Sequence, residues 1–497
     1  MEISQLEPRE VFRFFEEISR IPRGSGNTDA ISAYCVSFAE ERGLQAVKDP
    51  CGNVRIWKPG TKGKENNAPV ILQGHLDMVC EKEETCVHDF QKDPLELYVK
   101  EGFLKARGTT LGADDGIAVA FILALLDGKE IPHPPLEILL TIDEETGMDG
   151  ASAADLSGFS GSMLLNLDSE DEGILTVGCA GGFTFEIEQN IEEEELEGEE
   201  IEIVITGLQG GHSGTEISKH LANANKLAGR LILEMTEKIQ ARLLYINGGG
   251  KTNVIPSVCR VGFLLPNHRT EKFDDFCFES TSEPENAKQL TEKLQESWKR
   301  IYGQTEPELR VKLFEKGWQK KKGISRESTK TATALIHLCP DGVFSYSHHL
   351  EGQVEASNNL GIIRTETGKI RYQMLARSSE RFLAEELKGV LIRLAECVEK
   401  TNVSWKISGE YPAWEYKEES KLRDIAKNAY RELYGKDPIV ETIHAGLECG
   451  ILIGKKPELD CVSMGPQMYD VHSARERLEI ASVERTWEYL KKILKYI

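Results

Sequence analysis

Three short apolar runs in the first third of the chain constrain its fold most. They read PVILQ (69–73), LEILLTI (136–142) and SMLLNL (162–167). Segments with apolar residues at helical spacing alternate with them, and GIAVAFILALLDG (116–128) is apolar almost all round, with a length and alanine content that favour a buried helix. Buried strands that alternate with helices are typical of an α/β fold with a mainly parallel sheet. We therefore expect an α/β domain here.

The sequence changes character after residue 182. The segments FTFEIEQ (183–189) and EIEIVITG (200–207) alternate apolar and polar residues with a period of two, as half-exposed antiparallel strands do. Helical patterns follow at residues 217–235 and 283–302, and an α/β pattern with a closing helix returns near the end of the chain. At 497 residues the chain is too long for one ordinary core. We predict one α/β domain made of residues 1–182 and 412–497, and an inserted α+β domain made of residues 183–411.

The charge of the chain excludes two classes of partner. The formal net charge is −22, whereas a nucleic-acid backbone or an anionic membrane surface binds proteins through a basic footprint. Some of the acidity lies in IEEEELEGEE (191–200), which is most simply a solvated loop or edge. The N-terminal segment has no signal-peptide pattern, no apolar run approaches the length of a membrane span, and the eleven cysteines are scattered without a CxxC. We expect a soluble cytoplasmic protein.

Residue types that bind metals follow each of the three apolar runs. His75 and Asp77 follow the first run, Glu144 and Glu145 follow the second, and Asp168 follows the third. In an open α/β sheet, ligands bind beyond the carboxyl ends of the strands. We therefore expect these side chains to meet at one edge of the sheet.

Two further segments carry the same residue types. Asp114 and Asp115 stand just before or at the start of the predicted buried helix, and His472 lies near the end of the chain. Taken singly, each residue has an ordinary interpretation, since an aspartate at a helix start is usually a cap. Together, however, so many carboxylates at one edge would repel each other unless cations neutralise them.

The ligand types indicate which cations would bind. Imidazole and carboxylate without thiolate suit zinc, manganese or cobalt, and two metal ions that share a bridging carboxylate would absorb the charge best. From the residues alone, either Asp114 or Asp115 could be the bridge, and Glu144 and Glu145 could exchange roles.

Several motifs together resemble a known family. In chain order they are GHLDMV, GTTLGADDGIA, IDEETGMDGA, NLDSED, GGHSG and HAGLECG, followed by His472. The set resembles the co-catalytic dizinc peptidases of the aminoacylase and carboxypeptidase G superfamily, and within it the aminoacyl-histidine dipeptidase family, also called Xaa-His or cytosol non-specific dipeptidase. This resemblance spans nearly the whole chain. It implies a phosphorylase/hydrolase-like catalytic domain, an inserted lid and dimerisation domain, and hydrolysis of unblocked dipeptides.

The resemblance also implies a role for each candidate residue. The implied ligands of two divalent ions, Zn²⁺ first with Mn²⁺ or Co²⁺ as alternatives, are His75 and Asp168 for one ion, His472 and Glu145 for the other, and Asp114 as the bridge. Asp77 would orient the His75 imidazole. Glu144 would be the general base that takes a proton from the bridging water and delivers it to the leaving amine.

The inserted domain contributes three more candidates through the resemblance. His212, in LQGGHSG, would stabilise the tetrahedral oxyanion from the lid of a partner subunit, which implies a homodimer. On its residues alone, His212 could also be a turn residue among glycines, although this is the less favoured interpretation. Asn253 and Arg377 match positions that contact the substrate carboxylate, and the planar fork of an arginine can bind both carboxylate oxygens. His444 and Glu448 would line the pocket.

Three other interpretations of the chain stay open. Two are enzymes of the same superfamily, an N-acyl-amino-acid deacylase and a tripeptidase. The third is a catalytically silent relative that serves as a binding or dimerisation module. Loss of a metal ligand would be its signature, and the ligand set of this chain is intact.

Overall fold

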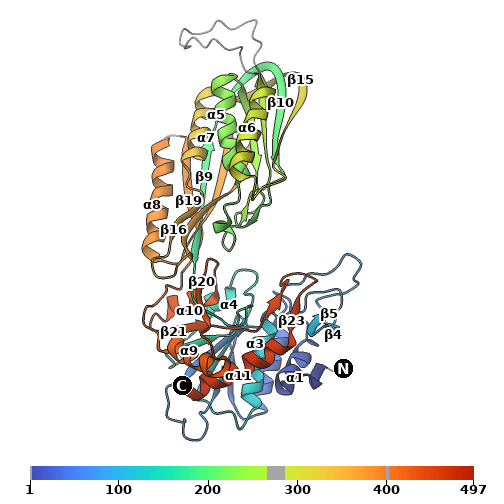
Figure 1. Ribbon diagram of the computed structural model, residues 1–497, viewed down its shortest axis with the longest axis vertical. Helices are drawn as coiled ribbons and strands as arrows, with labels where there is room; N and C mark the ends of the chain where they lie inside the picture. Colours follow the sequence, from blue (N-terminus) through green and yellow to red (C-terminus); the bar gives the residue numbers. More distant parts are fainter. Residues whose placement is uncertain (1–2, 266–285, 399–401) are drawn as a thin grey trace. The chain divides into compact units, whose positions relative to one another are not determined.

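The computed structural model describes residues 3–265, 286–398 and 402–497. The chain divides into two compact units (Figure 1). Unit 1 comprises Met1–Cys179, Trp414–Ile443 and Leu447–Ile497, and unit 2 comprises Ala180–Ala413 and His444–Gly446. The sequence predicts these boundaries between residues 182 and 183 and between residues 411 and 412.

The main sheet of unit 1 has the order β1-β2-β6-β3-β7-β21-β8-β20 in the described part of the chain. Its strands are β1 (Gln45–Lys48), β2 (Val54–Lys58), β3 (Val70–His75), β6 (Leu136–Thr141), β7 (Met163–Asn166), β8 (Ile174–Cys179), β20 (Ile439–Ile443) and β21 (Asp460–Ser463). The central strands β6, β3, β7 and β21 are parallel, and β1 and β2 add antiparallel strands at one edge. The three apolar runs are therefore the adjacent strands β6, β3 and β7, and the predicted α/β fold class is confirmed.

Helices cover both faces of this sheet. One face packs against α1 (Arg9–Ile18), α2 (Asp29–Glu40), α3 (Ala113–Asp127), α9 (Lys421–Tyr434) and α11 (Ile480–Tyr496), and the other against α4 (Asp149–Ala153) and α10 (Glu448–Lys455). Side chains of β3 point alternately to the two faces of the sheet. Val70 and Leu72 pack in the hydrophobic core on the first face, and Ile71 packs in the core on the second face. The α3 helix is buried all round because it lies between α1 and β3. No helix among the described residues has both the length and the apolar character needed to cross a membrane.

A small antiparallel sheet completes unit 1. It has the order β22-β23-β5-β4, and the bounds are β4 (Leu97–Lys100), β5 (Phe103–Ala106), β22 (Met468–Tyr469) and β23 (Arg477–Glu479). The turn between β22 and β23 carries His472. A short 3₁₀ helix, Ile3–Gln5, precedes α1.

Unit 2 is built on an antiparallel sheet. Its order in the described part is β15-β10-β14-β12-β17-β18-β9-β19, and β16 also pairs with β17. The strands are β9 (Gly181–Asn190), β10 (Glu193–Thr206), β12 (Arg242–Gly248), β14 (Cys259–Leu265), β15 (Arg310–Ile324), β16 (Gly342–Tyr346), β17 (Val354–Glu366), β18 (Lys369–Ser378) and β19 (Val403–Tyr411). The helices α5 (Ala224–Lys238), α6 (Ala287–Tyr302), α7 (Arg326–Leu338) and α8 (Arg381–Val398) pack on it in the order α6-α5-α7-α8 (Figure 1).

The same βαββαβ motif occurs twice in unit 2. One copy runs β10-α5-β12-β14-α6-β15 and the other runs β9-α7-β17-β18-α8-β19. Both have the same strand order, with the fourth strand beside the first and the second strand at the far edge. The second strands, β12 and β17, pair with each other through Asn247–Arg364 and Gly248–Ile363. The first copy is therefore inserted into the second, between β9 and α7.

Two helices of unit 2 begin later than the sequence patterns predict. Only a 3₁₀ turn (Ile217–Lys219) forms at the start of the predicted 217–235 helix, and α5 begins after Asn223, whose side chain accepts the backbone N–H of Asn225 and Lys226. In α6, Asn286 and Gln289 form a capping box. The first three residues of the predicted 283–302 helix lie outside the described residues.

Candidate functional site

The carboxyl ends of three neighbouring strands in unit 1 carry predicted ligands. His75 is the last residue of β3, Asp168 follows β7, and Glu144 and Glu145 follow β6. Since these strands are parallel neighbours, their carboxyl ends lie at the same edge of the sheet. Asp114 reaches this edge from the first turn of α3, where the backbone angles are not helical.

The Asp114 carboxylate lies between two imidazoles. Its Oδ1 is 3.1 Å from Nε2 of His75, and its Oδ2 is 3.0 Å from Nε2 of His472. His75 Nε2 also lies 3.4 Å from Oδ1 of Asp168, and His472 Nε2 lies 3.0 Å from Oε2 of Glu145. Each imidazole nitrogen thus faces Asp114 and one further acid. The structure brings together all five residues that the resemblance implies as ligands.

The cluster suits divalent cations. Ligand atoms of His75, Asp114 and Glu145 all lie within 4.8 Å of one another, and the same holds for His75, Asp115 and Asp168. The donors are imidazole nitrogen and carboxylate oxygen, as zinc, manganese and cobalt accept. Two features therefore make this cluster suitable for divalent cations: the types of donor atom, and the Asp114 carboxylate that faces two imidazoles.

The carboxylate of Asp115 has different partners from the carboxylate of Asp114. It is fully buried, its Oδ2 accepts the backbone N–H of His75 at 3.1 Å, and its Oδ1 has no partner among the described residues. Strand β3 can lie this close to the Asp115 carboxylate only because residue 74 is glycine. A Cβ at residue 74 would lie 2.6 Å from Oδ2 of Asp115. This geometry favours Asp114 over Asp115 as the bridge.

Asp77 holds the first histidine and the Glu144 turn together. Its carboxylate accepts hydrogen bonds from Ser25 Oγ at 2.8 Å and from the backbone N–H of Glu144 at 3.1 Å. Its Oδ1 lies 3.4 Å from Nδ1 of His75, and its backbone carbonyl lies 3.2 Å from the same nitrogen. Asp77 is therefore placed to orient the His75 imidazole without lying in the metal-ligand group.

Burial and crowding shift the proton affinities at this edge. Burial raises the pKa of Glu144 to about 9, and Asp168 and Glu448 add to the shift. Burial also raises the pKa of Asp168 to about 6. Hydrogen bonds to Asp114 and Glu145 raise the pKa of His472 to about 11. Without a metal, Glu144 and His472 therefore retain their protons at neutral pH, and a divalent cation bound by His472 would displace the proton of that imidazole.

A row of hydrogen-bonded side chains crosses the sheet beside the cluster. Glu448 is fully buried, and its Oε2 accepts from Nε2 of Gln73 at 2.5 Å and from Oγ1 of Thr141 at 2.6 Å. Gln73 in turn accepts from Nδ2 of Asn166 at 2.5 Å. Oε1 of Glu448 has no partner among the described residues, and burial raises the pKa of Glu448 to about 7. Glu448 therefore lies in the protein interior and does not line an open pocket.

Two buried charged residues at this edge were not singled out from the sequence. Arg23 is 2% exposed and donates to the carbonyls of Leu76 and Asp77. Glu476 is 3% exposed and accepts backbone N–H groups from the segment that precedes Asp114. No local signal marks either residue among the 60 Lys and Arg and 82 Asp and Glu of the chain.

The predicted residues His212 and Arg377 lie in unit 2. His212 Nδ1 accepts the backbone N–H of Thr215 at 3.2 Å, which leaves the proton of a neutral imidazole on Nε2. Burial and the charge of Arg377 lower the pKa of His212. The neutral ring therefore presents Nε2–H as a donor.

Arg377 is a buried cation. It is 6% exposed, donates to the Tyr411 hydroxyl at 2.8 Å, and has no acidic partner among the described residues. Beside it, burial and the Arg377 charge lower the pKa of His444 to about 3, and His444 Nε2 lies 2.7 Å from Oγ of Ser357. These residues make a positively charged, partly dehydrated patch that suits an anion. Asn253, the third unit 2 candidate, is exposed, and its carbonyl accepts the N–H of Ser213 at 2.9 Å.

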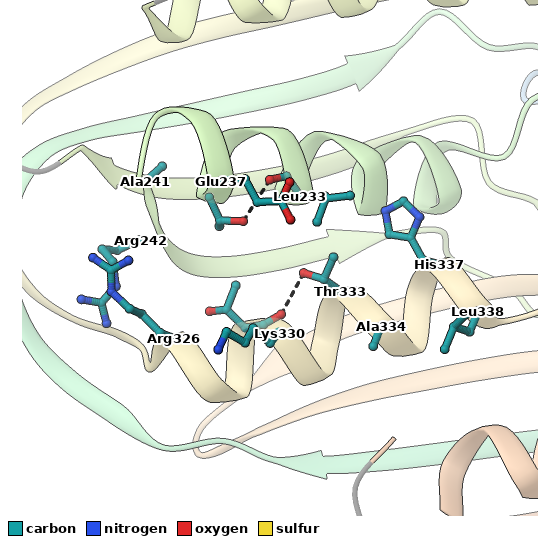
Figure 2. A pocket seen from close by; sticks show the side chains of 12 residues that line it. Leu233, Glu237, Ala241, Arg242, Arg326, Lys330, Thr333, Ala334, His337 and Leu338 are labelled. Carbon is teal, nitrogen blue, oxygen red and sulfur yellow. Dashed lines mark hydrogen bonds between the residues drawn. The ribbon is translucent and has the colours of Figure 1, made fainter. Parts of the chain in front are cut away.

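Unit 2 also has a cavity of about 460 Å³ between α5 and α7. Figure 2 shows Arg242 and Arg326 at one end of it and His337 and Leu338 at the other. None of the predicted site residues is among the described residues that line it. The cavity is thus separate from both residue groups described above.

Comparison with known proteins gives several matches. The sequence matches the model of peptidase family M20/M25/M40 over residues 71–496. It is 36% identical over 499 residues to cytosol non-specific dipeptidase of Escherichia coli (strain K12), a match that covers 100% of this chain and 99% of that protein. The crystal structure of aminoacylhistidine dipeptidase from Vibrio alginolyticus gives a TM-score of 0.88 at 36% identity, with 100% and 98% of the two chains covered. An aminopeptidase from Bacillus cereus, at 14% identity, 99% and 98% coverage and a TM-score of 0.56, shares the fold.

The buried Glu448 carboxyl predicts a dependence of stability on pH. Its pKa rises from an ordinary 4.5 to about 7 on folding, so the folded protein binds this proton more tightly than the unfolded chain does. The stability that it contributes is present below pH 4.5 and is lost as pH rises through about 7. At 1.36 kcal/mol per pH unit, the loss is about 3 kcal/mol.

Urea unfolding of the metal-free protein at about pH 5 and about pH 8 measures this loss. We expect Glu448→Gln to lose less unfolding free energy than the wild type between the two pH values, because its side chain cannot titrate. Equal losses for the two proteins would contradict the prediction.

Proposed function

The chain belongs to peptidase family M20/M25/M40, and from this we propose that it is a metal-dependent dipeptidase that hydrolyses unblocked dipeptides. The observation that carries the proposal is the Asp114 carboxylate between His75 and His472, each of which faces a further acid. Two relatives at 36% identity over the full chain are named as dipeptidases, which supports the substrate class. Cleavage of Xaa-His and broader dipeptidase activity are both compatible with this site.

Two divalent metal ions are the proposed cofactor, with Zn²⁺ first and Mn²⁺ or Co²⁺ as alternatives. The residues that would hold them are His75 and Asp168 for one ion, His472 and Glu145 for the other, and Asp114 for both. When bound, such a pair lowers the pKa of a water molecule and polarises the scissile carbonyl.

Glu144 is the proposed general base. Its backbone N–H donates to Oδ1 of Asp77 at 3.1 Å, which fixes the turn that carries it beside the cluster. The carboxylate can accept the proton of the attacking water and then deliver it to the leaving amine. Its neighbour Glu145 faces His472 and is the better ligand.

Unit 2 supplies the proposed substrate contacts. The Nε2–H of a neutral His212 is suited to donate to an oxyanion, and Arg377 is suited to bind the free carboxylate of a dipeptide. Asn253 is a proposed further contact with that carboxylate. We also propose a homodimer in which His212 acts across subunits, and a cytoplasmic location, which the name of the Escherichia coli relative supports.

Replacement of Glu144 by Gln tests the general base. We expect kcat for a small unblocked dipeptide to fall by about 10²–10⁴-fold, since the variant cannot carry the proton. Metal content per chain, measured by mass spectrometry, should stay at the wild-type value because Glu144 is not a proposed ligand. An unchanged kcat would refute the assignment.

Removal of metal tests the reaction class. We expect exhaustive chelation to abolish hydrolysis, and added Zn²⁺, Mn²⁺ or Co²⁺ to restore it, because the acids of the site need cations. A matched panel of a dipeptide, its N-acylated form and the corresponding tripeptide distinguishes the alternatives. Preferred cleavage of the acylated form would indicate a deacylase, and preferred cleavage of the tripeptide a tripeptidase. Activity that survives chelation would exclude a metal mechanism.

Mixed subunits test the role of His212. His212→Ala and Glu144→Gln should each be inactive alone. If His212 acts across subunits, mixing the two variants should restore part of the activity, because one site of the heterodimer has both residues intact. Exchange of differently tagged subunits provides the control. Exchange without recovered activity would place His212 in its own subunit's site or outside catalysis.

A further inference from the structure

The Glu476 carboxylate binds four consecutive backbone N–H groups. Its Oε2 accepts from Leu111 at 2.7 Å and Gly112 at 3.0 Å, and its Oε1 accepts from Ala113 at 2.8 Å and Asp114 at 3.4 Å. These donors lie just before and at the start of α3, and they have no carbonyl of a preceding helical turn to bind. Glu476 therefore holds the segment that carries the proposed bridging ligand.

The same glutamate belongs to the turn that carries His472. The backbone N–H of Glu476 donates to the carbonyl of Ser473 at 3.0 Å, and an ion pair between Asp470 and Arg477 closes the turn. His472 itself has a φ of 60°, a left-handed conformation that a non-glycine residue adopts at a cost and that its surroundings must maintain. Glu476 thus connects this turn to the Asp114 segment, although the two are far apart in the sequence.

Arg23 extends the connection to the His75 turn. Its Nη1 donates to the carbonyls of Leu76 at 3.0 Å and Asp77 at 3.1 Å, and its Nη2 donates to the carbonyl of Gly112. Gly112 has a φ of 63°, and a Cβ at this position would lie 2.6 Å from Nη2 of Arg23. The peptide groups of Gly112 therefore bind Arg23 through the carbonyl and Glu476 through the N–H.

We propose that Glu476 is a positioning residue for the metal site formed by His472, Asp114 and Glu145. Its carboxylate fixes the Asp114 segment relative to the His472 turn, so it sets the affinity of that site for its ion. The inference rests on the proposed function, in which these three residues bind a metal. Glutamine at position 476 would keep the size of the side chain, but one of its two terminal atoms would be an NH₂ group facing N–H donors, which leaves those donors unpaired.

Glu137 offers a matched control. It is 4% exposed, and its carboxylate accepts the backbone N–H groups of Ser160 and Gly161, both at 2.8 Å. The chemistry is that of Glu476, but the segment it holds carries no proposed ligand. A general loss of stability on removing a buried carboxylate should therefore affect both positions, whereas a positioning role should affect only residue 476.

Metal titration of the full chain tests the inference. The metal-free wild type, Glu476→Gln and Glu137→Gln are titrated with Co²⁺, and affinity and stoichiometry are measured by calorimetry together with the visible absorption spectrum of the bound Co²⁺. We expect Glu476→Gln to weaken one of the two binding events by about 10–100-fold and to change the spectrum, as loss of a group that orients ligands does. Glu137→Gln should bind Co²⁺ with wild-type affinity and spectrum, even where its thermal midpoint falls.

Two results would overturn the positioning role: wild-type Co²⁺ binding by Glu476→Gln, or an equal loss of affinity in both variants. If Glu476→Gln does not fold, Glu476→Asp replaces it, because aspartate keeps the charge but its shorter side chain loses the reach by which Glu476 binds the four N–H groups. We expect this variant to weaken the same binding event, and wild-type binding would again overturn the role. A wild-type chain that binds no Co²⁺ would instead refute the proposed function, so the two failures are distinguishable.

Discussion

Repulsion between carboxylates at one sheet edge is the constraint on which the rest of unit 1 depends. The acids are Asp77, Asp114, Asp115, Glu144, Glu145 and Asp168, and burial makes each of their charges costly. The surrounding structure offsets part of this cost: imidazoles face Asp114, and backbone N–H groups bind Asp77 and Asp115. Burial, and after it the charges of the neighbouring acids, still raises the pKa values of Asp115, Glu144 and Asp168. Divalent cations would remove the remaining repulsion, so metal binding should stabilise this edge of the fold.

The candidate ligands could be predicted because parallel strands all end at the same edge of a sheet, so residues that follow them in the sequence lie close together. Apolar runs that alternate with helices indicate parallel strands, and parallel strands bring His75, Glu145 and Asp168 to one edge. The choice between Asp114 and Asp115 could not be derived from adjacency, since both are carboxylates at a helix start. In the folded protein, Asp114 faces two imidazoles, whereas Asp115 accepts a backbone N–H.

Other features depend on contacts that no local pattern encodes. Glu476 and Arg23 look like surface charges in the sequence, because their partners are backbone groups of distant segments. The acidic run 191–200 predicts a solvated loop or edge, but most of it forms β10, which lies inside the sheet. There its glutamates face lysines of β15, for example Glu200 and Lys321 at 2.5 Å. The duplicated motif of unit 2 was also missed, since the two copies share topology without an evident sequence repeat.

The residue groups described in the two units, each taken by itself, carry charges of opposite sign. The cluster in unit 1 is acidic and calls for cations, whereas Arg377 in unit 2 is a buried cation without an acidic partner among the described residues. The charge of Arg377 also contributes to keeping His212 and His444 neutral. A neutral His212 can donate through Nε2 without adding positive charge, which leaves Arg377 as the positive charge of this patch and the group proposed to bind a carboxylate. Loss of the Arg377 charge should therefore weaken carboxylate binding and also raise the pKa of His212.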